Sequence, residues 1–136
     1  MDSSLPAGEV ARVAEFRAAL RLFLRKSERN ARQSDLTPQR YLLLLMIKGA
    51  PGGREHSTVT ELAERLQLAQ STVTELVRRA EETGLVRREQ SNSDGRVAHL
   101  ALTEEGERRL MKAFTTNEQE RNELRDAIAR LDAGQA

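Results

Sequence analysis

The sequence contains no cysteine and no tryptophan, and its longest uninterrupted apolar run, Tyr41–Ile47, is seven residues long. Without cysteine, these residues can form no disulfide, thiolate metal site, thiol redox sensor or cysteine nucleophile. No apolar stretch approaches the roughly 20 residues that span a bilayer. The first residues have neither the basic start nor the apolar stretch of a signal peptide. We therefore expect a cytoplasmic protein without a membrane segment.

Aromatic residues and net charge are also scarce. Aromatics make up 3% of the 136 residues, hydrophobic residues 38% and charged residues 32%, with a formal net charge of +1. A core without large rings must be built from Leu, Val, Ile and Ala, which favours packed helices. Residues 54–100 hold seven Arg and eight Asp or Glu. The net charge of these residues does not attract nucleic acid. Any attraction must therefore come from local clusters of arginine on one face.

The N-terminal third predicts two helices. Apolar residues recur at three- and four-residue steps over 9–33, which indicates one amphipathic helix. A row of arginines lies on another face of it, either as a solvated surface or as an anion-facing stripe: Arg17, Arg21, Arg25, Arg29 and Arg32. The second helix has Thr37 as N-cap and Pro38 as first residue. Its apolar run 41–47 predicts a central, mostly buried helix that Gly49 ends.

The middle of the chain predicts two short helices followed by a hairpin. Thr58 and Glu61 have the spacing of a capping box, and a turn at 68–69 leads to a second helix over 70–83. Strands are expected at 86–90 and 96–102, with Asp94-Gly95 as the turn between them. A long last helix begins after Thr103, and residues 115–117 are where it could bend.

Two short helices joined by a tight turn form a helix-turn-helix, whose second helix can enter the major groove of DNA. In the helix over 70–83, apolar and polar residues lie on separate faces: Val73, Leu76, Val77 and Ala80 point inward, and polar residues point outward. Ser and Thr can bond bases or phosphate, Gln can pair with adenine, and Arg can pair with guanine. The predicted DNA-binding residues are Thr58, Gln70, Ser71, Thr72, Thr74, Arg78, Arg79, Arg88, Ser91, Asn92, Asp94 and Arg96.

Five short motifs stand out in and just after this segment: ELAERL at 61–66, QSTVTELV at 70–77, GLVRR at 84–88, DGR at 94–96 and LTEEG at 102–106. Together they are similar to the multiple-antibiotic-resistance repressor (MarR) family of winged helix-turn-helix regulators. One departure is Ala69, where family members usually have a Ser or Thr cap. The resemblance implies a mainly helical α+β fold with a small β-hairpin wing. Three segments follow from it: an N-terminal dimerisation helix (1–36), a winged helix-turn-helix domain (37–102) and a C-terminal dimerisation helix (103–136).

The resemblance also implies a function. It implies a cytoplasmic homodimer that binds a pseudo-palindromic operator in double-stranded DNA through two half-sites about 10 base pairs apart. It implies a repressor released by a small molecule, often aromatic and anionic, and Arg96 is expected to face the minor groove or its phosphates. Dimerisation should depend on the first helix and the 103–131 helix. The candidate effector-pocket residues are Phe16, Leu20, Phe23, Tyr41, Leu45 and Phe114.

Two other functions remain open. A winged helix can bind protein without binding DNA, and the neutral charge of residues 54–100 motivates that alternative. A small enzyme is the third possibility, but no Gly-rich phosphate loop or nucleophile elbow is present. His56 and His99 are the only histidines, and nothing in the sequence places them together. We expect no catalytic residue, no cofactor and no metal site.

Overall fold

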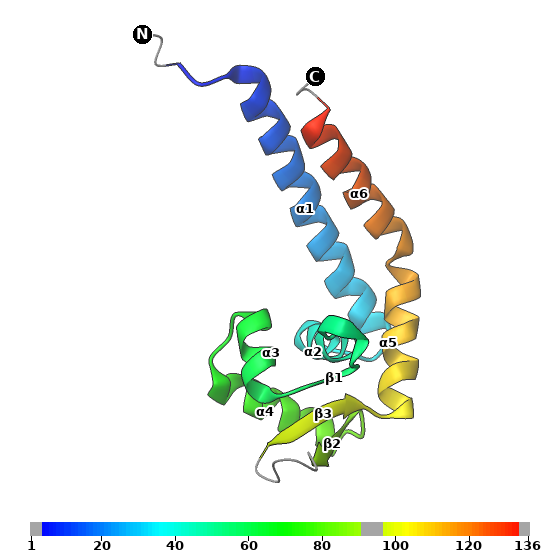
Figure 1. Cartoon of the computed structure of the whole chain (residues 1–136). Coiled ribbons are helices and arrows are strands. Elements are labelled where there is room, and N and C mark those ends of the chain that lie inside the picture. The colour runs from blue at the N-terminus through cyan, green and yellow to red at the C-terminus, as the bar shows by residue number, and fades with distance from the viewer. Residues whose placement is uncertain (1–3, 91–96, 134–136) are drawn as a thin grey trace.

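The molecule consists of a compact lobe and a long helical arm (Figure 1). The computed structural model describes residues 4–90 and 97–133. In chain order its helices and strands are α1 (Ala7–Gln33), α2 (Pro38–Lys48), a 3-10 turn at Pro51–Gly53, β1 (His56–Ser57), α3 (Val59–Leu66), α4 (Gln70–Glu82), β2 (Val86–Gln90), β3 (Ala98–Leu102), α5 (Glu104–Thr116) and α6 (Glu118–Asp132). Helices with one small sheet confirm the predicted α+β class.

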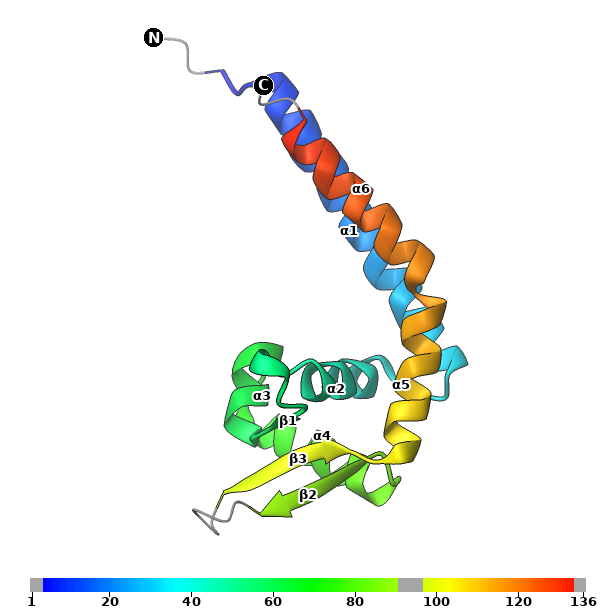
Figure 2. The same cartoon turned by 45° about the vertical axis from the view of Figure 1, so that its right-hand side comes forward.

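The arm is made of the two ends of the chain. Helices α1 and α6 run side by side away from the lobe, and both termini lie near its far end (Figures 1 and 2). α5 connects the arm to the sheet. Among the described residues, no helix is long and apolar enough to cross a membrane.

Helix α2 lies at the centre of the lobe, as its apolar run predicts. Thr37 caps its first turn by accepting a hydrogen bond from the Arg40 amide at 3.1 Å. The side chains of Leu43, Leu44 and Ile47 are completely buried, whereas Leu42 is 41% exposed. α2 packs against α1, α3, α4, α5 and β3. It is therefore the element that holds the arm, the two short helices and the sheet together.

The sheet has three antiparallel strands in the order β1-β3-β2. Strands β2 and β3 form the predicted hairpin, with Val86 opposite Leu102 and Gln90 opposite Ala98. Strand β1 was not predicted, because residues 50–57 read as a loop by composition. It pairs with β3, with His56 opposite Ala101 and Ser57 opposite Leu100. A two-residue strand has no periodicity of its own, and only its pairing with residues 43 and 45 positions away defines it.

The predicted last helix is two helices. The helical backbone breaks at Asn117, whose ψ of 4° departs from α-helical geometry. α5 packs on α2 and β3, and α6 packs on α1. The bend lies within the 115–117 region where the sequence allowed one. It lets one half of this segment belong to the lobe and the other half to the arm.

Candidate nucleic-acid interface

Helices α3 and α4 form a helix-turn-helix whose first helix is fixed at both ends. The Thr58 hydroxyl accepts from the Glu61 amide at 3.2 Å, and the Glu61 carboxylate accepts from the Thr58 amide at 3.0 Å. This is the predicted capping box. Arg65 donates to the Met46 carbonyl of α2 at 2.9 Å, which ties α3 to the central helix. Gln67 ends α3 in the left-handed conformation with φ 57°.

Helix α4 presents the polar face that the sequence predicted. Val73, Val77 and Ala80 are completely buried. Six predicted contact residues are exposed to solvent on α4: Gln70, Ser71, Thr72, Thr74, Arg78 and Arg79. No side chain caps the start of α4, since Ala69 is the N-cap. The backbone N–H groups of the first turn are therefore available to donate hydrogen bonds to an anion such as phosphate.

The arginines on α4 are already engaged by carboxylates of the same helix. Glu75 accepts from Arg78 at 2.5 Å and from Arg79 at 3.0 Å, and Glu82 forms a further ion pair with Arg78. The hydrogen bonds from Arg78 and Arg79 lower the pKa of Glu75 to about 2. These pairs place carboxylates beside the arginines, so this surface has little net positive charge although it is rich in arginine.

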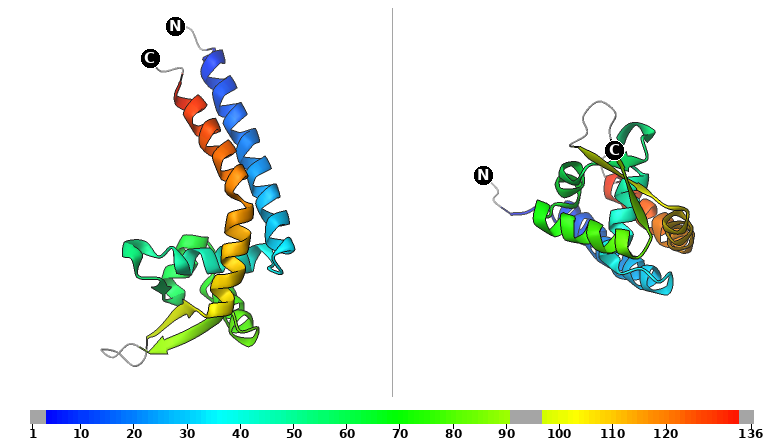
Figure 3. Two further views of the ribbon diagram at one scale, coloured as in Figure 1. Left: turned by 90° about the vertical axis from the view of Figure 1, so that its right-hand side faces the viewer. Right: turned by 90° about the horizontal axis from the view of Figure 1, so that it is seen from below.

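The strands carry a similar arrangement beside α4. Arg88 on β2 donates to both carboxylate oxygens of Glu81 at 3.0 Å, and Arg87 pairs with Glu89 at 2.8 Å. In the view from the end opposite the arm, α4 and the hairpin both lie at this end of the lobe, where α4 contacts β2 (Figure 3, right). The predicted contacts Ser91, Asn92, Asp94 and Arg96 lie outside the described residues.

Thr58 is the one described candidate that is not fully exposed. Its side chain is half-buried, and its hydroxyl is already used in the capping box. Thr58 therefore positions the start of α3. Because its hydroxyl oxygen only accepts in the capping box, its O–H group can still donate to a phosphate.

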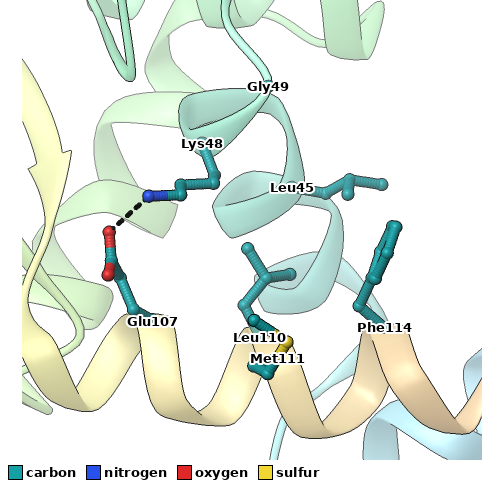
Figure 4. Close-up of a pocket in the computed structure, with 7 residues that line it drawn as sticks. All are labelled: Leu45, Lys48, Gly49, Glu107, Leu110, Met111 and Phe114. Carbon is teal, nitrogen blue, oxygen red and sulfur yellow. Dashed lines mark hydrogen bonds and ion pairs between the residues drawn. The ribbon is translucent and has the colours of Figure 1, made fainter.

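A mostly apolar cavity of about 350 Å³ lies between α2 and α5 (Figure 4). Its lining residues are Leu45, Lys48, Gly49, Glu107, Leu110, Met111 and Phe114. Lys48 Nζ lies 2.7 Å from a Glu107 carboxylate oxygen and 3.1 Å from one of Glu55. The hydrogen bonds with Glu107 and Glu55 raise the pKa of Lys48. The cavity thus combines an apolar wall with an ammonium group that is paired with two carboxylates.

The six candidate pocket residues do not come together in the single chain. Leu45 and Phe114 line this cavity, whereas Phe23 lines another one between α1 and α6. Phe16 and Leu20 are half-buried on α1, and Tyr41 is buried in the core at 6% exposure. The sequence prediction missed Lys48, Leu110 and Met111. Pairing the apolar positions of 110–114 with the last turn of α2 would have found them.

His56 and His99 are neighbours, contrary to the prediction that nothing brings them together. Their Nδ1 atoms are 3.1 Å apart, and the two rings are perpendicular with centroids 4.8 Å apart. Pairing of β1 with β3 causes this proximity, so it could not be seen while β1 was unpredicted. In the parts of the chain that the structure describes, no group of three or more His, Cys, Asp or Glu is arranged to hold a metal ion.

Comparison with known proteins agrees with this geometry. Residues 34–97 match the sequence profile of the MarR family. Over these residues the chain is similar to MarR-family regulators. A curated relative, the organic hydroperoxide resistance transcriptional regulator of Bacillus subtilis (strain 168), is 35% identical over 74 residues, which are 53% of this chain and 46% of that protein. The match therefore spans about half the length of this relative.

Solved structures of MarR-family regulators share the whole fold. AbsC from Streptomyces coelicolor superposes with a TM-score of 0.72 at 22% identity, over 97% of this chain and 91% of that one. Sco3205 from the same organism, solved in complex with DNA, gives a TM-score of 0.64 at 27% identity, over 94% and 78% of the two chains. The winged helix-turn-helix fold predicted from the sequence is confirmed.

Proposed function

We propose that this protein is a transcription regulator of the MarR family that reads double-stranded DNA with α4 and the hairpin. The observation that carries the proposal is the exposed face of α4, where short polar side chains and two arginines lie opposite a completely buried apolar face. Sco3205, which has the same fold, was solved with DNA bound. The relatives found are transcription regulators, and we propose no catalytic activity.

The residues divide into two roles. Gln70, Ser71, Thr72 and Thr74 lie near the start of α4 and would contact base edges in the major groove. Arg78 and Arg79 of α4, and Arg88 of β2, would contact phosphates, as would the predicted Ser91, Asn92 and Arg96. Asp94 carries the same sign of charge as phosphate and would instead orient the guanidinium of Arg96. Because Glu75, Glu81 and Glu82 pair with the described arginines, binding would exchange carboxylate partners for phosphates.

The proposed regulator is a homodimer joined through its arms. Several apolar side chains of the arm face solvent in the single chain: Val10 at 44%, Val13 at 47%, Leu24 at 50% and Ile128 at 46% exposure. Exposed apolar stripes of this kind mark partner surfaces. A two-fold dimer would place two α4 helices on half-sites about one helical turn apart, so the operator would be pseudo-palindromic.

We also propose that a small-molecule effector occupies the cavity between α2 and α5. Its binding would cause the protein to leave the promoter that it represses. The apolar wall suits a compact molecule, and one negative group on that molecule would pair with Lys48 in exchange for Glu107 or Glu55. No cysteine is present, so thiol oxidation is not the signal.

We expect benzoate to raise the melting temperature of the protein, and the substitution Lys48→Met to abolish that rise. An equal rise with neutral benzamide would contradict the anionic class.

Selection from a random DNA pool, followed by a salt titration of the selected duplex, tests the DNA-binding function. We expect affinity to fall steeply with salt, because each phosphate contact releases counterions. Gln70→Ala should lower affinity for the selected site by about tenfold or more, because a bidentate base contact is lost. Gln119→Ala on α6 is the matched control and should bind like the unsubstituted protein. Absence of any salt-dependent binding would contradict the proposal.

The alternative function is a module that binds protein and not DNA. The carboxylate-paired arginines of α4 favour it, because they leave little net positive charge on that face. The same selection separates the two functions, since a protein-binding module would enrich no DNA sequence.

A further inference from the structure

The arm leaves the lobe at a joint that has a buried asparagine at its centre. Asn117 ends α5 and begins α6, and it is only 1% exposed. No proline or glycine lies at this break in the helix. Helix breaks without such a residue need another cause, such as a side-chain interaction that favours the bent backbone.

The Asn117 amide joins three different parts of the molecule. Its Oδ1 accepts from Asn30 Nδ2 of α1 at 2.5 Å. Its Nδ2 lies 3.3 Å from the hydroxyl oxygens of Ser27 on α1 and Tyr41 on α2, and can donate to either. All four side chains are at most 9% exposed. One amide therefore connects the arm, the central helix of the lobe and the bend itself.

The solvent side of the joint is held as well. Arg121 of α6 donates to the Phe114 carbonyl of α5 at 2.5 Å, and its guanidinium lies 3.7 Å above the Phe114 ring. The bend is thus fixed from the buried side by Asn117 and from the exposed side by Arg121.

A buried polar network adds little net stability, because each group loses water when it gains a partner. What such a network specifies is one geometry, since its hydrogen bonds form only when all partners are aligned. Apolar side chains at this joint would tolerate a range of bend angles. The geometry therefore points to Asn117 as the positioning residue that sets the angle between arm and lobe.

This inference rests on the proposed dimer and has a consequence for DNA recognition. If the arms join two copies, the angle at each joint sets the separation of the two α4 helices. One added base pair moves a half-site by about 3.4 Å and rotates it by about 35° around the duplex. A fixed joint would therefore select one half-site spacing, and a loosened joint would accept several.

The angle can be measured in the free protein without reference to DNA. The sequence has no cysteine, so Glu64→Cys on α3 and Ala129→Cys on α6 allow one pair of spin labels, diluted into unlabelled protein. Ala129 lies 12 residues beyond the joint, so a change of about 10° would move its label by roughly 3 Å. We expect Asn117→Leu to shift or broaden the distance distribution by at least that amount.

Asn117→Ser serves as a second variant, because its small hydroxyl removes the amide with less disturbance of folding. Asn122→Ala is the matched control, since Asn122 is an exposed asparagine on α6 whose one side-chain hydrogen bond among the described residues comes from Arg125 at 3.0 Å. The control should leave the distance distribution unchanged. Folded Asn117 variants whose distances match those of the unsubstituted protein would overturn the inference.

The second measurement is binding to a series of operators that differ by one base pair in half-site spacing. We expect the unsubstituted protein to prefer one spacing by about tenfold, and the Asn117 variants to bind neighbouring spacings within about threefold. An unchanged spacing preference would also overturn the inference. Failure of the unsubstituted protein to bind any duplex would contradict the proposed function, while the label distances would still decide the role of Asn117.

Discussion

At the scale of single residues, Gly106 shows how closely α5 is seated on the lobe. A Cβ atom at this position would lie 2.1 Å from the Leu85 carbonyl oxygen. The same corner is held by Thr103, which donates from its hydroxyl to the Gly84 carbonyl at 2.6 Å and from its amide to the Leu85 carbonyl at 3.1 Å. Glycine is needed here for close approach of two backbones, although it weakens a helix.

We therefore predict that Gly106→Ala lowers the free energy of unfolding by about 2 kcal/mol, because the backbone must shift to admit a methyl group. Urea denaturation measures this. Gly8→Ala in α1 is the control, since its Cβ would lie 3.6 Å from the flexible Arg12 side chain. The control should be neutral or slightly stabilising. Equal effects of the two substitutions would show that contact with Leu85 is unimportant.

Glu61 is a second residue with a measurable signature. Hydrogen bonds from Arg54 and from the Thr58 amide lower its pKa to about 2, against an ordinary value of 4.5. Because the folded value is the lower one, Glu61 contributes stability above pH 4.5, and this contribution disappears as the pH falls towards about 2. NMR titration of the carboxyl should show the low pKa. Arg54→Ala should raise it, and an unchanged titration would contradict the assignment to Arg54.

At the scale of elements, α4 holds its cationic side chains in ion pairs within one helix. Glu75 pairs with both Arg78 and Arg79. If α4 contacts DNA as proposed, the carboxylate of Glu75 would oppose the approach of phosphates and would keep non-specific binding weak. The pairing would lower the affinity of α4 for DNA of any sequence and leave discrimination between sequences to its contacts with bases.

Glu75→Gln is therefore expected to strengthen binding to non-operator DNA and to steepen its salt dependence by about one unit of slope, because one repulsive charge is lost. Fluorescence anisotropy in a sodium chloride series measures both. Glu64→Gln on α3, an exposed residue without an ion pair among the described side chains, provides the comparison. If both variants bind like the unsubstituted protein, Glu75 does not regulate affinity.

At the scale of the whole molecule, the arm has more apolar surface than the single chain covers. Its α1 helix packs against α6, yet Val10 and Val13 remain 44% and 47% exposed. Because these apolar side chains lie on the arm, the interface of the proposed dimer is expected there.

We predict that Val13→Asp weakens self-association by at least about tenfold, because a buried carboxylate without a partner is unfavourable. Light scattering after gel filtration gives the mass as a function of concentration. Ala14→Asp is the matched control. Although Ala14 follows Val13 in the sequence, it points about 100° away from Val13 around α1, on the same face as Arg21 and Arg25. Retention of the dimer in Val13→Asp at low concentration would place the interface elsewhere.

Local signals in the sequence predicted much of this molecule. The Thr37–Pro38 cap of α2 and the Thr58–Glu61 capping box of α3 lie where they were expected. The inward and outward residues of α4 were also sorted correctly. Caps and periodicity involve residues within four positions of each other, so the chain carries them without help from the fold.

The tertiary structure alone decided which distant surfaces meet. Strand β1, the His56–His99 contact and the Lys48–Glu107 pair at the cavity join residues 43 to 59 positions apart. The Asn30–Asn117 bond joins residues 87 positions apart. Such contacts depend on how the helices are stacked and not on any local pattern. The sequence therefore determined the helices and the character of their faces, and the packing of α1, α2 and α5 determined the cavity, the joint and the direction of the arm.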